Sequence, residues 1–72
     1  MRIEFYQHLT SQRPIEAVKA IRSTLAAGLL MIDGETVAEY DHVRGQWTRL
    51  GLEKSYRFAR IRIESDPLNG SH

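Results

Sequence analysis

The chain has 72 residues, no cysteine and a formal net charge of +1. This length suits one domain, which buries only about 60% of its unfolded surface. The absence of cysteine excludes disulfides and thiolate metal sites, and it favours a reducing compartment. Hydrophobic residues are 42% of the chain and charged residues 26%, which is ordinary for a folded globular domain rather than a disordered chain. Because no apolar stretch approaches the roughly 18 residues of a membrane span, we expect a soluble, cytoplasmic protein with no membrane partner.

The first part of the chain predicts a strand followed by a helix. Residues 1–6 alternate, with Ile3 and Phe5 on the side expected to face the core. Pro14 suits the first position of a helix, and Gly28 suits the position after its end. Between them the apolar residues recur at helical spacing: Ile15, Val18, Ile21 and Leu25. We therefore predict a helix over residues 14–27.

Residues 29–52 predict three short strands joined by two tight turns. Asp33-Gly34 is a strong signal for a type I′ turn, because both central residues of that turn need a positive φ. A second turn is expected near Arg44-Gly45. The resulting register sets Leu30 opposite Val37 and Arg49 opposite Tyr40.

Alternation divides the side chains of this meander between two faces. The expected core face holds Leu29, Met31, Ala38, Tyr40 and Trp47, and the expected solvent face holds Glu35, Glu39, Asp41, Gln46 and Thr48. Apolar residues such as Leu30 and Ile32 also fall on the solvent face, so either a second layer covers it or a bulge shifts the register. A helix is the alternative, since Val37, Tyr40, Val43, Trp47 and Leu50 recur at helical spacing. Thr36-Val37 and the Asp-Gly turn favour the strand.

Residues 56–64 (YRFARIRIE) alternate as one further strand. Ala59, Ile61 and Ile63 are expected to face the core, and Tyr56, Phe58, Arg60 and Arg62 the opposite side. The expected fold class is therefore α+β, with one helix packed on a four- to five-stranded, largely antiparallel sheet in β-α-β-β-β-β order. Residues 1–65 form the single expected domain, and the polar residues 66–72 form a flexible tail.

The sequence contains no recognisable catalytic or metal-binding pattern. The histidines are His8, His42 and His72, and none has a partner at a suitable spacing. Neither a phosphate-binding glycine loop nor a zinc or calcium motif is present. The acids Glu35, Glu39 and Asp41 could bind a divalent cation, but such a run is more often a solvated face. We expect no catalytic residue, no metal and no cofactor.

Charge is separated along the chain. Residues 33–41 contain four acids and no base, whereas residues 44–62 contain six bases and one acid, Glu53. Separated charge of this kind steers and orients partners. The alternative is that the two runs lie on adjacent strands and pair with each other.

Aromatic and basic residues interleave in the last predicted strand. Tyr56 and Phe58 would offer rings on which bases stack, and Arg60 and Arg62 would meet phosphates, as in modules that bind single-stranded nucleic acid. The segment RGQWTRL followed by YRFARIRI resembles the closing strands of RelE-type messenger-RNA-cleaving toxins. The helix pair that opens that fold has no counterpart in this chain, so we do not assign the chain to that family.

These observations predict a small, non-enzymatic binding protein. A chain of this size that starts with Met1 is expected to be a whole gene product, a bacterial or phage regulator or inhibitor that docks on a larger protein. Aromatic residues and arginine are enriched at protein interfaces. The predicted contact residues are Tyr56, Arg57, Phe58, Arg60, Arg62, Trp47 and Arg49 on the basic side, and Glu35, Glu39 and Asp41 on the acidic side. Nucleic-acid binding is the alternative function, and a homodimer through exposed strand edges is possible.

Overall fold

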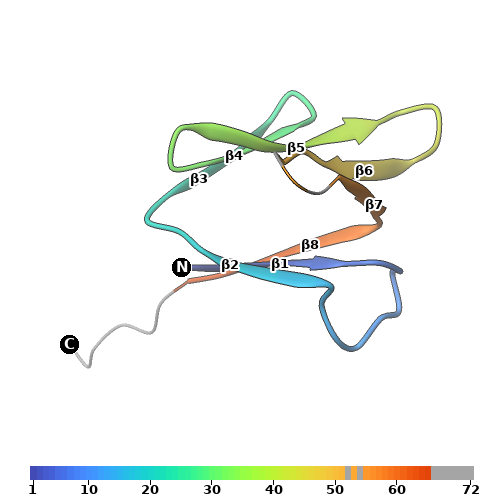
Figure 1. Ribbon diagram of the computed structural model, residues 1–72, viewed down its shortest axis with the longest axis horizontal. Coiled ribbons are helices and arrows are strands. Elements are labelled where there is room, and N and C mark those ends of the chain that lie inside the picture. The colour runs from blue at the N-terminus through green and yellow to red at the C-terminus, as the bar shows by residue number, and fades with distance from the viewer. Residues whose placement is uncertain (52, 54, 66–72) are drawn as a thin grey trace.

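The protein is built from strands alone in the part of the chain that the structure describes, residues 1–51, 53 and 55–65 of a computed structural model. Two antiparallel sheets lie one above the other (Figure 1). Sheet A has the order β2-β1-β8 and contains β1 (Arg2–Tyr6), β2 (Glu16–Lys19) and β8 (Arg60–Glu64). Sheet B has the order β3-β4-β5-β6-β7 and contains β3 (Ser23–Ala26), β4 (Leu29–Ile32), β5 (Glu35–Asp41), β6 (Gln46–Arg49) and β7 (Tyr56–Phe58).

The predicted helix over residues 14–27 is wrong, and with it the α+β fold class. This segment forms β2, a corner and β3, and Ala27-Gly28 is the turn into β4, with φ of 54° and 74°. Gly28 was expected to end a helix, but its positive φ serves a hairpin instead. Intrinsic preferences are small, and pairing with β1 and β4 overrides them here.

The apolar stripe that suggested the helix does not mark a buried face. Ile21 lies in the corner between β2 and β3 and is 87% exposed, and Leu25 on β3 is 51% exposed. Both strands lie at the edge of their sheets, where a side chain lacks a neighbour on one side. The helical spacing of these residues is therefore coincidental.

The three strands predicted over residues 29–52 are confirmed as β4, β5 and β6, with one register shift, although β6 ends at Arg49 and Leu52 lies outside the described residues. Asp33 and Gly34 have φ of 50° and 84°, as the predicted turn requires, and residues 35–41 are a strand rather than a helix. Leu30 pairs with Ala38 but Met31 pairs with Thr36, so Val37 is an extra residue in β5. This irregularity is the bulge that the sequence left open as a possibility. The predicted pairing of Leu30 with Val37 is wrong by one residue.

The bulge changes which side chains are buried. Leu30 and Ile32 point into the molecule and are buried, whereas Met31 faces outward opposite Thr36. Leu29 lies on the same outer face, opposite Glu39. The expected core face was therefore correct for Ala38, Tyr40 and Trp47 and wrong for the two residues of β4.

The predicted last strand is divided between the sheets. Residues 56–58 pair with β6 in sheet B, and residues 60–64 pair with β1 in sheet A. The chain crosses at Ala59, whose N–H donates to the Tyr6 carbonyl at 2.8 Å. Phe58 is fully buried, so its predicted outward orientation is wrong.

The core lies between the two sheets and connects them. Ile3 and Phe5 of sheet A and Leu30 and Phe58 of sheet B are fully buried. The Phe5 and Phe58 rings are 4.8 Å apart between centroids, and Trp47 stacks on Phe58 at 6.3 Å. These contacts fix the two sheets together. The described residues contain no helix long and apolar enough to cross a membrane.

Candidate binding face

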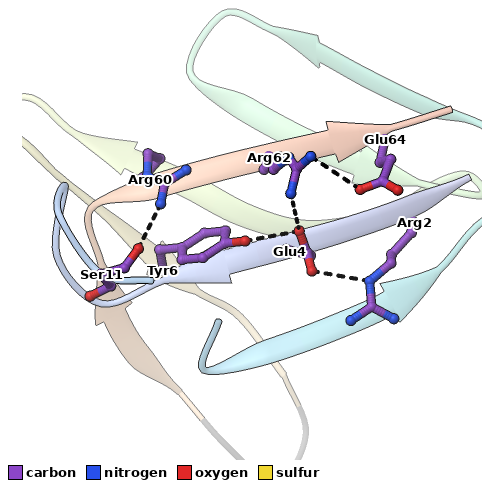
Figure 2. A network of polar contacts seen from close by, with 7 residues as sticks. All are labelled: Arg2, Glu4, Tyr6, Ser11, Arg60, Arg62 and Glu64. Atoms are coloured by element: carbon purple, nitrogen blue, oxygen red, sulfur yellow. Dashed lines mark hydrogen bonds and ion pairs between the residues drawn. The ribbon is translucent and has the colours of Figure 1, made fainter. Parts of the chain in front are cut away.

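The outer face of sheet A carries a connected set of polar side chains. Directly opposite residues in an antiparallel pair point to the same side of the sheet. The register of β1 with β8 sets Arg2 opposite Glu64, Glu4 opposite Arg62 and Tyr6 opposite Arg60. Ile3 and Phe5 alternate with these residues and fill the core. We call this set the sheet-A face; it consists of Arg2, Glu4, Tyr6, Arg60, Arg62 and Glu64 (Figure 2).

Glu4 is the centre of the sheet-A face. It is only 6% exposed, and it accepts hydrogen bonds from the Tyr6 hydroxyl at 2.9 Å and from Arg2 Nε at 3.1 Å. Arg62 Nη1 lies 3.5 Å from the same carboxylate oxygen as Tyr6. The hydrogen bond from Tyr6, followed by that from Arg2, lowers the pKa of Glu4 below its ordinary value. Glu4 is therefore an anion that holds cations in place.

Arg60 is held flat against the sheet-A face. Its guanidinium lies 3.8 Å from the centroid of the Tyr6 ring, and its Nη2 donates to the Ser11 carbonyl at 2.9 Å. Arg60 Nε is buried and has no hydrogen-bond partner among the described residues. An arginine stacked on a tyrosine in this way is a rigid, largely preordered group.

Two guanidinium groups of the sheet-A face remain half in solvent. The Arg2 side chain is 52% exposed and the Arg62 side chain 55% exposed, although both contact Glu4. Arg62 also lies 3.4 Å from Glu64. Because each guanidinium has five N–H donors, both keep donors free for a ligand. A partner carboxylate or phosphate could bind these donors in pairs.

A second carboxylate, Glu16 on β2, connects the two sheets. Arg49 on β6 donates to it through Nε at 3.1 Å and Nη2 at 3.2 Å, and the Tyr56 hydroxyl on β7 also donates to it. Arg49 Nη1 donates to the carbonyls of Val37 and Leu50. Burial and the hydrogen bond to Glu16 raise the pKa of Tyr56 above its ordinary range. We call Glu16, Arg49 and Tyr56 the inter-sheet latch.

The latch borders an open groove of about 600 Å³. Glu35, one of the predicted contact residues, lines this groove together with Glu16 and Arg49. The arginine in the groove is already engaged by the Glu16 carboxylate and by backbone carbonyls. Besides this arginine, the lining of the groove consists mainly of the carboxylates of Glu16, Glu35 and Glu53 and the apolar residues Val37 and Leu50.

The structure separates the other predicted contact residues. Tyr56 and Phe58 belong to the latch and the core, and Trp47 is partly buried against Phe58. Arg57 is exposed on the outer face of sheet B, opposite Thr48, whereas Arg60 and Arg62 belong to sheet A. The four residues predicted to form one nucleic-acid surface thus do not share a face, because the chain changes sheets at Ala59.

The acidic residues are separated as well. Glu39 is exposed on the outer face of sheet B, and Asp41 accepts hydrogen bonds from the N–H groups of Val43 and Arg44 in the turn after β5. Arg49 lies opposite Ala38 rather than Tyr40, so it does not sit between these two acids. Among the described residues, the alternative in which the acidic and basic runs pair with each other is limited to Asp41 and Arg44, 3.7 Å apart.

Sequence reasoning missed Arg2, Glu4, Tyr6 and Glu16. The alternation of residues 1–6 did place the first three on a common side, and that signal was available. It did not show that Glu4 would be buried, because Arg62, which lies opposite it on β8, is 58 residues away in the chain. The predicted helix over residues 14–27 would place Glu16 in its first turn, so this prediction gave no reason to expect a contact with Arg49.

Comparison with known proteins identifies no relative. No family model matches the chain, and neither a curated protein nor a solved structure matches it. Nothing in these comparisons supports the expected role as a regulator or inhibitor of bacterial or phage origin. The function must therefore be argued from the residues themselves.

Proposed function

We propose that this protein is a non-enzymatic binding protein that docks on a larger, acidic protein through the sheet-A face. The observation that carries the proposal is the buried Glu4 carboxylate, which holds Arg2 and Arg62 while about half of each side chain stays exposed. Holding an arginine in place before binding reduces the entropy that association must overcome. Arginine and tyrosine are also the residues that most often dominate binding energy at interfaces.

The charge of the face sets the chemistry of the partner. Its three arginines outnumber its two carboxylates, and Lys19 lies opposite Arg2 on β2. A partner that presents aspartate or glutamate side chains can form bidentate pairs with Arg2 and Arg62. Nucleic acid is the competing partner, but Tyr56 and Phe58 point inward and offer it no stacking surface. We place this activity in the cytoplasm, which the absence of cysteine favours.

The test is a tagged capture experiment in cell lysate with two double variants of equal net charge. R2Q/R62Q removes the two half-exposed arginines of the sheet-A face. R44Q/R57Q removes two arginines that lie elsewhere, in the turn after β5 and on the outer face of sheet B. We expect wild type and R44Q/R57Q to capture the same protein at stoichiometric level. The amount captured by R2Q/R62Q should be lower by about tenfold or more.

Nuclease treatment separates the two kinds of partner. A protein that stays bound after treatment supports the proposal. Capture that disappears with the nucleic acid would instead favour the nucleic-acid hypothesis. Equal capture by R2Q/R62Q and wild type, with both variants folded by circular dichroism, would contradict the assignment of the site.

A further inference from the structure

The open edge of β8 is suited to a second copy of the same chain. Among the described residues, β8 pairs only with β1, so its other edge has no strand beside it. Ile63 on this strand is 41% exposed although it lies on the inner side of the sheet, opposite Ile3. An exposed strand edge with an apolar residue readily recruits another strand.

The hydrogen-bond pattern shows which backbone groups face that edge. Met1 and Ala20 bond to each other in both directions, at 2.8 and 2.9 Å. Because bonded and non-bonded pairs alternate along an antiparallel ladder, the even residues of β1 direct their N–H and C=O groups toward β8. The even residues of β8 lie opposite the even residues of β1 and form hydrogen bonds with them. The N–H and C=O groups of the odd residues, Ile61 and Ile63, therefore point to the open edge.

Self-pairing of a strand about a two-fold axis has a strict geometric condition. Opposite residues must lie on the same face of the sheet, so their numbers must differ by an even amount. Arg60 and Glu64 are four residues apart and satisfy this condition. On β2, Glu16 and Lys19 are three apart and do not. Among the described edge strands, β8 alone carries opposite charges at an allowed separation.

We infer that two copies of the chain associate through β8 in an antiparallel arrangement centred on Arg62. In this register Arg60 of each copy lies opposite Glu64 of the other, which forms two ion pairs. Ile61 lies opposite Ile63 of the other copy, so the open N–H and C=O groups of both strands are satisfied and the exposed Ile63 is covered. Sheet A becomes a continuous six-stranded sheet with the order β2-β1-β8-β8-β1-β2.

The one like-charged contact in this register is compensated. Arg62 would lie opposite Arg62 of the second copy, but each guanidinium already lies 3.4 Å from Glu64 and 3.5 Å from Glu4. The dimer would place two sheet-A faces side by side. It does not require the docking function proposed above, because its contacts are made along the edge of the sheet.

Cysteine cross-linking tests both the dimer and its register, since the natural chain has no cysteine. In a non-hydrogen-bonded antiparallel pair the Cα atoms are about 4.5 Å apart, within the range of a disulfide. We therefore expect R62C to form a disulfide-linked dimer at least about tenfold faster than I63C or the control R57C on β7. Equal rates for R62C and R57C would overturn the dimer, and fastest cross-linking of I63C would overturn the register.

Sedimentation provides a second test that does not depend on cysteine. We expect the wild type to reach twice the 8.3 kDa mass of one chain at millimolar concentration. E64R places an arginine opposite Arg60 of the other copy and should raise the dimer dissociation constant about tenfold. The control E39R changes the charge equally on the outer face of sheet B and should leave that constant unchanged. A monomeric wild type at every concentration would overturn the inference.

Discussion

Glu4 and Glu16 accept the same two kinds of donor, yet they serve different parts of the molecule. Each carboxylate accepts a hydrogen bond from a tyrosine hydroxyl and from an arginine guanidinium. The donors to Glu4 come from its own sheet, and they form a flat, polar outer face. The donors to Glu16 come from the opposite sheet. The role of each carboxylate thus depends on where its donors lie. Donors from the same sheet order the side chains of an outer face, whereas donors from the opposite sheet hold the two sheets together.

The largest loss of stability is expected where the apolar contact between the two sheets is removed. Phe58→Ala deletes a fully buried ring that lies between Phe5 and Trp47. We expect a loss of about 3–5 kcal/mol in the free energy of unfolding. For a chain of this length such a loss is comparable to its whole stability. Urea denaturation followed by circular dichroism measures it, and a loss below about 1 kcal/mol would contradict the described packing.

Breaking the inter-sheet latch should have the next largest effect. Arg49→Met roughly keeps the length of the side chain but removes the guanidinium hydrogen bonds to Glu16 and to the Val37 carbonyl, which then keep those from the Tyr56 hydroxyl and the Leu50 N–H. We expect the free energy of unfolding to fall by about 2 kcal/mol. Arg57→Met on the next strand is the matched control and should change it by no more than about 0.5 kcal/mol. Similar values for the two variants would show that the latch adds no stability.

Removing the hydroxyl of Tyr56, the tyrosine of the latch, should have a smaller effect on the free energy of unfolding. Tyr56→Phe removes one hydrogen bond to Glu16 and should cost about 1 kcal/mol. The raised pKa of Tyr56 also gives a pH dependence, because the unfolded chain ionises at the ordinary value near 10. The stabilisation is present below that pH and is lost as the pH rises through the folded pKa. The free energy of unfolding should therefore fall less steeply with rising alkaline pH in Tyr56→Phe than in the wild type. An identical pH profile for the two proteins would contradict the role assigned to the Tyr56 hydroxyl.

The smallest effect on stability is expected from weakening the contacts of Glu4. There the pKa of the carboxyl is the most direct quantity to measure. Its folded pKa is lowered below the ordinary value of 4.5, chiefly by the Tyr6 hydroxyl. The stabilisation it adds is therefore present above pH 4.5 and is lost as the pH falls through the folded pKa. Tyr6→Phe should move the pKa of Glu4 back toward its ordinary value. NMR titration of the Glu4 carboxyl tests this, and an unchanged pKa in the variant would contradict the assigned cause.

The local elements with strong turn signals were predictable from the sequence. The turn at Asp33-Gly34 and the strands on either side of it follow from residues that lie next to each other in the chain. The first strand was equally clear, because Ile3 and Phe5 alternate with polar residues. The prediction for residues 14–27 was wrong because the helical spacing of the apolar residues was given more weight than the turn at Ala27-Gly28, which pairs β3 with β4.

The sites themselves depend on contacts that the sequence does not show. Glu16 meets Arg49 across 33 residues, and Glu4 meets Arg62 across 58. The contact of Glu4 with Arg62 depends on the crossing at Ala59, which divides an apparently continuous strand into β7 and β8, and the contact of Glu16 with Arg49 depends on the packing of one sheet on the other. Tyr56, Phe58, Arg60 and Arg62 do alternate along the sequence. The crossing nevertheless places the two aromatic residues between the sheets and the two arginines on the outer face of sheet A. The expected tail lies outside the described residues.

One measurement tests the division of roles most directly: tagged capture of the binding partner by Glu4→Gln and Glu16→Gln, side by side. Both substitutions remove one negative charge and keep the size of the side chain. We expect the folded Glu16→Gln variant to retain the partner, whereas Glu4→Gln, which no longer holds Arg2 and Arg62 in place, should lose most of it. Retention by Glu4→Gln together with loss by a folded Glu16→Gln would show that the groove at the latch, rather than the sheet-A face, is the binding surface.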